Sequence, residues 1–193
     1  MHRILVDWVS LSDTQIDRLS EIFHPRTAEV REDILLPHTS VHEIYFVCHG
    51  LLRFYYLSDE GIESNKAFVA ENSFAGALAA MNLNLPVIYG IQALEPTTYL
   101  VAQLQDFIDL YEQDYVFERL GRKFAEWILI RKELRMRSLL QQQARQRYIS
   151  FMQNYPELIS RVPQYHIASY LGITEVSLSR IKRELTEKST IEP

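Results

Sequence analysis

The sequence predicts an α+β protein in which an antiparallel sandwich or barrel is followed by a long helix and a C-terminal helical domain. Three observations support this prediction. Short segments rich in β-branched and aromatic residues crowd the N-terminal half, and a long stretch without proline begins at residue 115. Two short amphipathic patterns joined by a glycine lie near the C-terminal end. We place the boundaries at residues 1–114, 115–137 and 138–193.

The barrel is predicted from four short apolar segments that are separated by turn residues. These segments are residues 44–47, 51–57, 64–69 and 98–104. Their β-branched and aromatic side chains favour strands, and the glycine-containing sequences between them favour tight turns. Several short strands at close spacing are typical of an antiparallel sandwich or barrel. A helix over residues 12–23 is expected to precede them, because Ser12 is a suitable N-cap.

The C-terminal helix pair is the most informative part of the sequence. Residues 162–185 read VPQYHIASYLGITEVSLSRIKREL, with apolar residues at helical spacing on both sides of Gly172. Glycine suits the left-handed conformation that ends a helix, and Thr174 can cap the next helix. Two short helices around such a turn form a helix-turn-helix, whose second helix enters the major groove of DNA. The spacing alone fits an ordinary helical hairpin equally well.

The residues themselves are more specific than their spacing. The strings IASYLGIT and LSRIKREL resemble the DNA-binding element of the Crp/Fnr (catabolite-activator) family of bacterial transcription regulators. The matching positions are Ile167, Leu171, Gly172, Leu178, Ser179, Arg180 and Ile181. The resemblance implies an N-terminal jelly-roll barrel of the cyclic-nucleotide-binding type, a long dimerisation helix and a C-terminal winged helix-turn-helix. It also implies a homodimer that binds double-stranded DNA, with RNA polymerase as a further candidate partner.

The exposed face of the second helix supplies the expected DNA contacts. By position, Arg180 resembles the family's base-reading arginine, and an arginine can donate two hydrogen bonds to guanine O6 and N7. The same interface is expected to include Glu175, Val176, Ser177 and Ser179, with Lys182, Arg183 and Gln164 as candidate phosphate contacts. The family often has a glutamate where this chain has Val176, so the usual half-site sequence is in doubt.

Within the barrel, residues 72–94 resemble the family's phosphate-binding cassette, which closes over a cyclic nucleotide. The cyclic-nucleotide binders use a carboxylate for the ribose, an arginine for the phosphate and then a hydroxyl. This chain has Ala77, Val87 and Ile88 at these positions. A buried anion without a counter-charge is costly, so cyclic AMP is not expected to bind in the usual way. No cofactor is expected. Two interpretations stay open, an apolar pocket for an unidentified small-molecule effector or a ligand-free core, around Gly76, Ala77, Leu78, Val87 and Ile88.

The segment from residue 115 carries an apolar repeat with alternating spacings of three and four. Its members are Phe117, Leu120, Phe124, Trp127, Arg131 and Leu134. This spacing is typical of the seam of a two-stranded coiled coil, so we predict that it joins two copies of the chain. The alternative is that the same face packs on the chain's own barrel. In a dimer, the twin helix-turn-helix elements read half-sites one DNA turn apart.

The charge distribution agrees with a division into two parts. Residues 1–114 hold 6 basic and 17 acidic residues, whereas residues 115–193 hold 14 basic and 8 acidic residues. A basic C-terminal half favours attraction to phosphates, although solvated helices also carry charge.

Cys48 is the single cysteine, which excludes an intrachain disulfide. With no signal peptide and no apolar run of about 20 residues, we expect a cytoplasmic protein without a membrane span.

No catalytic or metal-binding constellation stands out in the sequence. There is no nucleophile elbow and no P-loop. His38, His42 and His49 follow one another at spacings that match no common zinc pattern. We therefore predict a protein that is not an enzyme and binds no metal. The alternative is a cupin-like jelly-roll protein that binds a small molecule or a metal and uses its helical tail for assembly.

Overall fold

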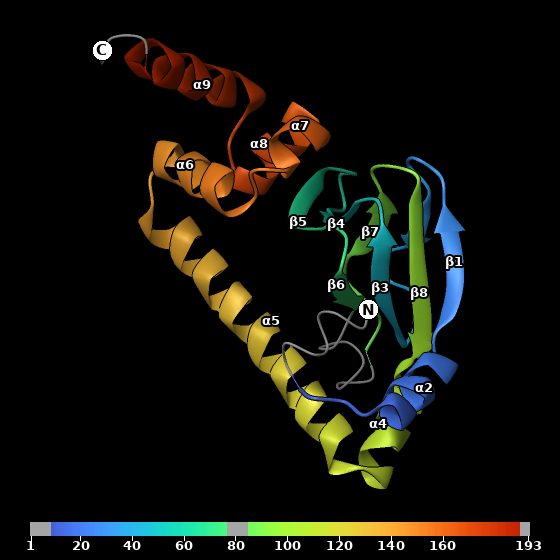
Figure 1. The fold of residues 1–193 in the computed structure, drawn as a ribbon. Helices are drawn as coiled ribbons and strands as arrows, with labels where there is room; N and C mark the ends of the chain where they lie inside the picture. Colours follow the sequence, from blue (N-terminus) through green and yellow to red (C-terminus); the bar gives the residue numbers. More distant parts are fainter. Residues whose placement is uncertain (1–8, 77–84, 190–193) are drawn as a thin grey trace. The chain divides into compact units, whose positions relative to one another are not determined.

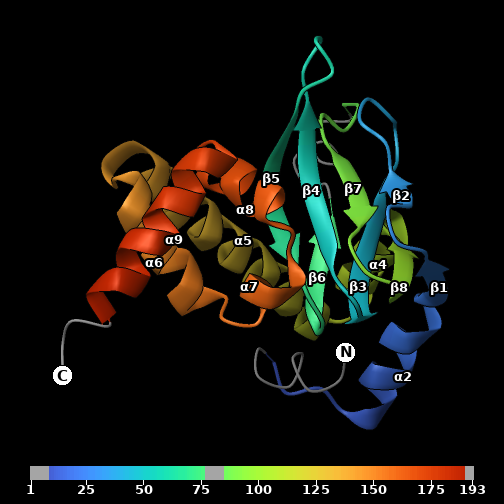
Figure 2. The ribbon, with the colours of Figure 1, turned by 90° about the horizontal axis from the view of Figure 1, so that it is seen from above.

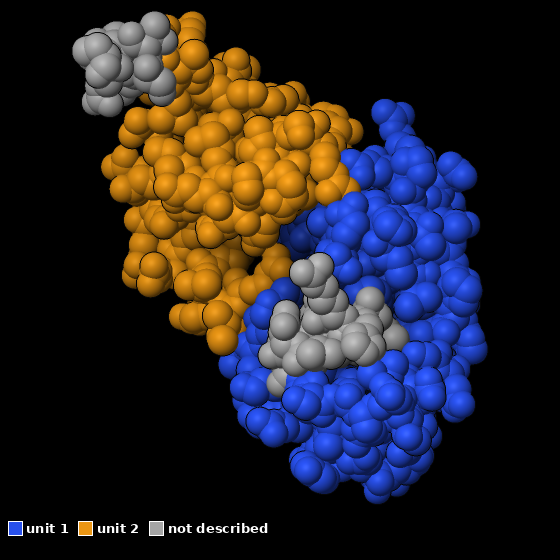
Figure 3. Space-filling model, viewed as in Figure 1, with its two compact units in different colours: residues 1–62, 66–129 blue, residues 63–65, 130–193 orange. Residues whose placement is uncertain are grey.

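The computed structural model describes residues 9–76 and 85–189, which form a mixed α+β fold (Figure 1). The chain divides into two compact units, shown in different colours in Figure 3. Unit 1 comprises Met1–Ile62 and Lys66–Leu129, and unit 2 comprises Glu63–Asn65 and Ile130–Pro193. The division falls inside a helix, at residues 129 and 130, rather than at the expected boundaries after residues 114 and 137.

Unit 1 is built on two four-stranded antiparallel sheets. One sheet has the order β1-β8-β3-β6 and the other has the order β2-β7-β4-β5, whose strands lie side by side in Figure 2. The strands are β1 His24–Ala28, β2 Asp33–Leu35, β3 Glu43–His49, β4 Leu52–Leu57, β5 Glu63–Val69, β6 Ser73–Gly76, β7 Gly90–Ala93 and β8 Thr97–Gln103. The four strands expected from sequence are confirmed as β3, β4, β5 and β8. The other four are short and carry little alternation, which is why the sequence did not indicate them.

A first helix and a first strand lead into this arrangement. Helix α2, Asp13–Glu21, begins as expected after Ser12, and Ser12 and Gln15 form a reciprocal capping box. Pro25 follows this helix and lies within β1. Because β1 is an edge strand of its sheet, a proline is tolerated there without breaking a ladder on both sides.

The core of unit 1 joins both sheets to the long helix α5, Tyr115–Gln141. The Phe74 ring contacts those of Phe46 and Phe124, with ring centres 4.9 and 5.3 Å apart. Phe117, Leu120 and Phe124 are buried in this core. These three side chains are covered by their own chain, so they are not available to pair with a second copy. The first half of the predicted seam instead packs on the barrel, which is the alternative that the sequence left open. A barrel face and a partner helix select the same apolar spacing, so the sequence could not separate them.

Gly50 connects β3 to β4 and is required by both its conformation and its surroundings. Its φ is 96°, and a Cβ at this position would lie 2.7 Å from the Pro96 oxygen and 2.8 Å from the Thr97 Cα. We predict that Gly50→Ala lowers the free energy of unfolding by about 2–5 kcal/mol, combining left-handed strain with overpacking. Urea unfolding measures this change. Gly61→Ala is the matched control, because Gly61 has a φ of 77° but nothing within 4 Å of a Cβ. Equal losses for the two variants would contradict the backbone-contact argument.

Helices make up most of the remaining chain. They are α4 Leu104–Gln113 in unit 1, and α6 Ala144–Asn154, α7 Leu158–Arg161, α8 Gln164–Leu171 and α9 Glu175–Ser189 in unit 2. Helix α5 continues beyond residue 137, the expected end of the long helix, to Gln141, and Gln143 caps α6 with Gln146. The part of the chain that the structure describes has no strand after β8, so the strands of a wing are not seen there. Within the described residues, none of the helices has the length and apolar character needed to cross a bilayer.

Candidate nucleic-acid interface

Helices α8 and α9 are the two short helices, joined by a glycine turn, that the sequence predicted. Gly172 ends α8 with φ 66° and ψ 41°, in the left-handed region. Thr174 caps α9, since its Oγ1 accepts a hydrogen bond from the Ser177 backbone N–H at 3.2 Å. The expected apolar stripe lies inside, and the buried side chains are Ile167, Ala168, Leu171, Leu178 and Ile181. The turn and its core therefore follow directly from local sequence signals.

The outer face of α9 forms a ridge of three residues, Val176, Arg180 and Arg183. At about 100° per residue, these residues lie within about 60° of one another, on the side opposite Leu178 and Ile181. All three are exposed. The ridge therefore points away from the core of unit 2.

The remaining expected DNA contacts lie around this ridge. Glu175, Ser177 and Ser179 are exposed on α9, Lys182 is half-buried, and Gln164 is exposed at the start of α8. The structure thus leaves the expected contact residues on the surface of the helix-turn-helix.

The arginines of the ridge are paired along the helix. Arg180 Nε donates to Glu184 Oε1 at 3.0 Å, and Arg183 Nε lies 3.8 Å from Glu187 Oε1. Both pairs are exposed pairs of the i,i+4 type, which contribute only about 0.3–0.5 kcal/mol. Either guanidinium can therefore exchange its carboxylate for another acceptor at little cost.

Two arginines from neighbouring helices hold the C-terminal end of α8. Arg147 Nε donates to the Leu171 oxygen at 2.9 Å, and its Nη1 donates to the Gln142 oxygen at 2.7 Å. Arg135 Nη2 donates to the Tyr170 oxygen, and its guanidinium lies 3.8 Å from the Tyr170 ring centre. Burial lowers the pKa of Arg135. The cations satisfy carbonyls at the negative end of the helix dipole, so they fix the turn against α5 and α6.

These two positioning arginines were not found by sequence reasoning. Arg135 and Arg147 lie on helices with many charged residues, where a basic side chain usually reads as solvated. Arg131 was assigned to the pairing seam, but its Nη2 donates to the Tyr155 hydroxyl at 3.0 Å in unit 2.

Helix α5 presents a second apolar stripe, which consists of Ala125, Leu129, Lys132, Met136 and Leu139. Its members follow at spacings of 4, 3, 4 and 3, and all of them are exposed. The stripe is rotated by about 100–120° around the helix from the buried face of Phe117, Leu120 and Phe124. Leu134, from the seam predicted by sequence, is also exposed but lies about 180° from the stripe.

The residues expected around the effector pocket do not share one environment. Val87 is fully buried in the core of unit 1, and its backbone N–H donates to the Thr39 oxygen at 2.9 Å. Ile88 is exposed, and the Gly76 oxygen accepts from the Tyr89 hydroxyl at 3.0 Å. Ala77 and Leu78 lie outside the described residues. Because Val87 is packed among apolar side chains, this position holds no counter-charge for a phosphate.

A cation that the sequence did not indicate lies beside this segment. The Nζ of Lys66, from β5, is 3.3 Å from the ring centre of Tyr89 and also faces the rings of Phe54 and Tyr56. Burial, followed by the neighbouring Tyr56, raises the pKa of Tyr89. The sequence of the cassette did not indicate Lys66 because the sheet brings β5 to this segment from another part of the chain.

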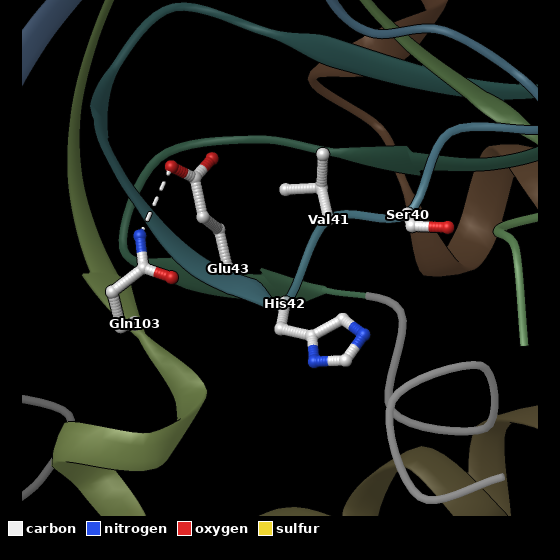
Figure 4. Close-up of a pocket in the computed structure, with 5 residues that line it drawn as sticks. All are labelled: Ser40, Val41, His42, Glu43 and Gln103. Atoms are coloured by element: carbon white, nitrogen blue, oxygen red, sulfur yellow. Dashed lines mark hydrogen bonds between the residues drawn. The ribbon is translucent and has the colours of Figure 1, made fainter. Parts of the chain in front are cut away.

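Unit 1 has an open depression on the surface of its described residues, and two of the polar groups that line it bind one another. It is lined by Ser40, Val41, His42, Glu43 and Gln103 (Figure 4). The Glu43 carboxylate accepts from Gln103 at 3.3 Å and from the Tyr45 hydroxyl at 2.9 Å, so its oxygens are engaged by the protein. Across residues 9–76 and 85–189, no three His, Cys, Asp or Glu side chains are grouped so that they could hold a metal ion.

Comparisons with known proteins agree with this fold. Residues 25–114 match the family model of the cyclic nucleotide-binding domain. The structure is similar to FixK2 from Bradyrhizobium japonicum, with a TM-score of 0.77 and 19% identity over 87% of this chain and 86% of that chain. A CooA mutant from Carboxydothermus hydrogenoformans gives a TM-score of 0.71 and 18% identity, covering 88% and 79% of the two chains. The catabolite activator protein of Thermus thermophilus gives 0.58 and 18%, covering 96% and 87%. No curated protein sequence matches the chain.

These findings show that residues 25–114 are similar to cyclic nucleotide-binding domains and that most of the chain has the fold of these solved structures. At the level of fold, the resemblance to the Crp/Fnr regulators that the sequence predicted is confirmed.

Proposed function

We propose that this chain is a dimeric, sequence-specific DNA-binding transcription regulator of the Crp/Fnr type that acts in the cytoplasm. The observation that carries this proposal is the exposed ridge of α9, with Arg180 and Arg183 on a helix pair whose turn is held by two half-buried arginines, Arg135 and Arg147. The recognition helix of such a motif places the residues of its N-terminal part against base edges. Double-stranded DNA is the partner of this ridge, and RNA polymerase is a further partner. The chain is not an enzyme.

The residues of the interface divide into two roles. Arg180 donates to guanine O6 and N7, because a guanidinium fork matches this pair of acceptors. Glu175, Ser177 and Ser179 flank it at the base edges. Lys182, Arg183 and Gln164 contact phosphates, which contribute affinity and salt dependence without sequence information.

Dimerisation uses the exposed stripe of α5 rather than the seam predicted from the sequence. Ala125, Leu129, Met136 and Leu139 form an apolar line at coiled-coil spacing, interrupted by Lys132. A single polar residue in such a line fixes the register of two parallel helices. Two copies joined in this way carry two recognition helices, which a palindromic operator requires.

Selection from a pool of random duplexes tests the proposed function. The full-length protein is incubated with the pool, and the retained duplexes are amplified and sequenced over several rounds. We expect a palindromic sequence with half-sites about 10 base pairs apart, centre to centre. If the protein instead retains duplexes of unrelated sequence with equal affinity, it does not bind DNA sequence-specifically and the proposal is wrong on this point.

We predict that cyclic AMP does not stabilise the protein against heat. If a protein binds a ligand with a Kd of about 10 μM, about 1 mM of that ligand raises its free energy of unfolding by about 2.7 kcal/mol. This raises Tm by several degrees. Here Val87 lies in the apolar core where the phosphate-binding arginine is expected, so we predict no measurable shift with cyclic AMP or cyclic GMP. Scanning fluorimetry measures Tm, and the selected duplex serves as the positive control. An increase in Tm at micromolar cyclic AMP would contradict the prediction and would show that the chain binds cyclic AMP as conventional nucleotide sensors do.

A further inference from the structure

Val176 is an apolar side chain at the centre of a polar surface. It is 80% exposed, and no other large apolar side chain of the described residues is more exposed. A single exposed valine is ordinary on a protein surface, but this one occupies the first turn of α9. It lies one turn before Arg180 on the same ridge, about 40° away around the helix. On a recognition helix, this is where side chains meet base edges.

The chemistry of the major groove offers one apolar partner to such a side chain. Adenine, guanine and cytosine present hydrogen-bond donors and acceptors there, whereas thymine adds a C5-methyl group. A valine placed against a polar edge leaves that group without a partner, which costs free energy. Against a methyl group, the same side chain buries apolar surface on both sides.

We propose that Val176 reads the C5-methyl group of a thymine in each half-site, beside the guanine that Arg180 reads. This inference rests on the proposed function, because it names the sequence that the same interface selects. Glu175 is not a substitute for Val176, since it lies about 100° around the helix from the ridge.

The spacing of the two residues limits where this thymine lies. Four residues of an α-helix span about 6 Å, and successive base pairs on one strand are about 3.4 Å apart. The thymine therefore lies within about two base pairs of the guanine bound by Arg180. The proposal therefore also predicts where in the operator this thymine lies.

The test removes the methyl group from the DNA and the side chain from the protein. In the selected duplex, each thymine is replaced in turn by deoxyuridine, which lacks only the C5-methyl group. For the wild-type dimer, we expect one thymine per half-site whose replacement weakens binding about fourfold, the factor given by burial of one methyl group. Replacing it in both half-sites is expected to weaken binding about 16-fold. For Val176→Ala, the same replacements should change affinity by less than about twofold.

Two controls separate this result from damage to the fold. Val176→Ala removes an exposed side chain from a helix, so Tm should stay unchanged. Val176→Thr keeps one methyl group at the same place and should retain part of the sensitivity to deoxyuridine. Fluorescence anisotropy at fixed salt gives all affinities on one scale.

Three outcomes decide the matter. A symmetric thymine near the guanine, whose methyl effect disappears in Val176→Ala, supports the inference. A selected duplex with no thymine that depends on residue 176 overturns it and leaves the proposed function intact. A selection that yields no specific duplex overturns both.

Discussion

Arg180→Ala is expected to abolish sequence-specific DNA binding while leaving the fold unchanged. A bidentate contact from arginine to guanine contributes about 1–3 kcal/mol of discrimination per half-site. Because the proposed dimer makes the contact twice, the variant should lose about 2–6 kcal/mol, or roughly 30-fold to more than 10⁴-fold in affinity for the selected duplex. Fluorescence anisotropy at fixed salt, with the selected duplex and a scrambled duplex, measures the loss.

The structure provides the reason to expect an intact fold. Arg180 is exposed, and its pair with Glu184 is of a kind that stabilises helices by a few tenths of a kcal/mol. Arg183 remains in the variant, so affinity for the scrambled duplex should fall only slightly, through the loss of one cation. A variant that keeps full discrimination between the two duplexes would remove Arg180 from the interface.

Glu184→Gln is the matched control for this experiment. It breaks the same ion pair at 3.0 Å but keeps the arginine. If the pair itself organised the interface, both variants would lose specificity. If Arg180 acts by contacting DNA, Glu184→Gln should bind at least as tightly as the wild type, since it removes a carboxylate that competes with DNA for the guanidinium.

The helix-turn-helix could be predicted from sequence because its signals are local. Gly172 needs only its own backbone conformation, and Thr174 needs only the N–H groups of the next turn. The apolar stripe of Leu178 and Ile181 depends on helical periodicity alone. These features are encoded within about 20 residues, so they do not depend on how distant parts of the chain pack.

Features that depend on tertiary contacts were predicted less completely. The periodicity of α5 indicated one apolar face, but the sequence could not say whether Phe117 and Phe124 meet a barrel or a partner. Lys66 lies against Tyr89 because strands bring them together, and no spacing in the sequence records that contact. The edge strands β1 and β2 are defined by their partners β8 and β7 rather than by their own residues.

The corrected face of α5 leads to the second large effect, expected for Leu129→Glu. In a dimer through the exposed stripe, the two copies of Leu129 are buried, and burial of a leucine contributes about 1.5–3 kcal/mol each. Losing both weakens association by about 3–6 kcal/mol, or roughly 10²-fold to more than 10⁴-fold in the dimer dissociation constant. Two carboxylates facing each other add repulsion. Sedimentation equilibrium measures the dissociation constant directly.

Leu134→Glu separates the observed stripe from the seam predicted by sequence. Leu134 is also exposed, but it lies on the side of α5 opposite the stripe, so this variant should stay dimeric. If Leu134→Glu dissociates the dimer and Leu129→Glu does not, the interface follows the original seam and the stripe has no role in pairing.

DNA binding provides an independent check. A monomer engages one half-site at a time and loses the gain from effective concentration, so Leu129→Glu should also lose affinity for the palindrome but keep its affinity for a single half-site.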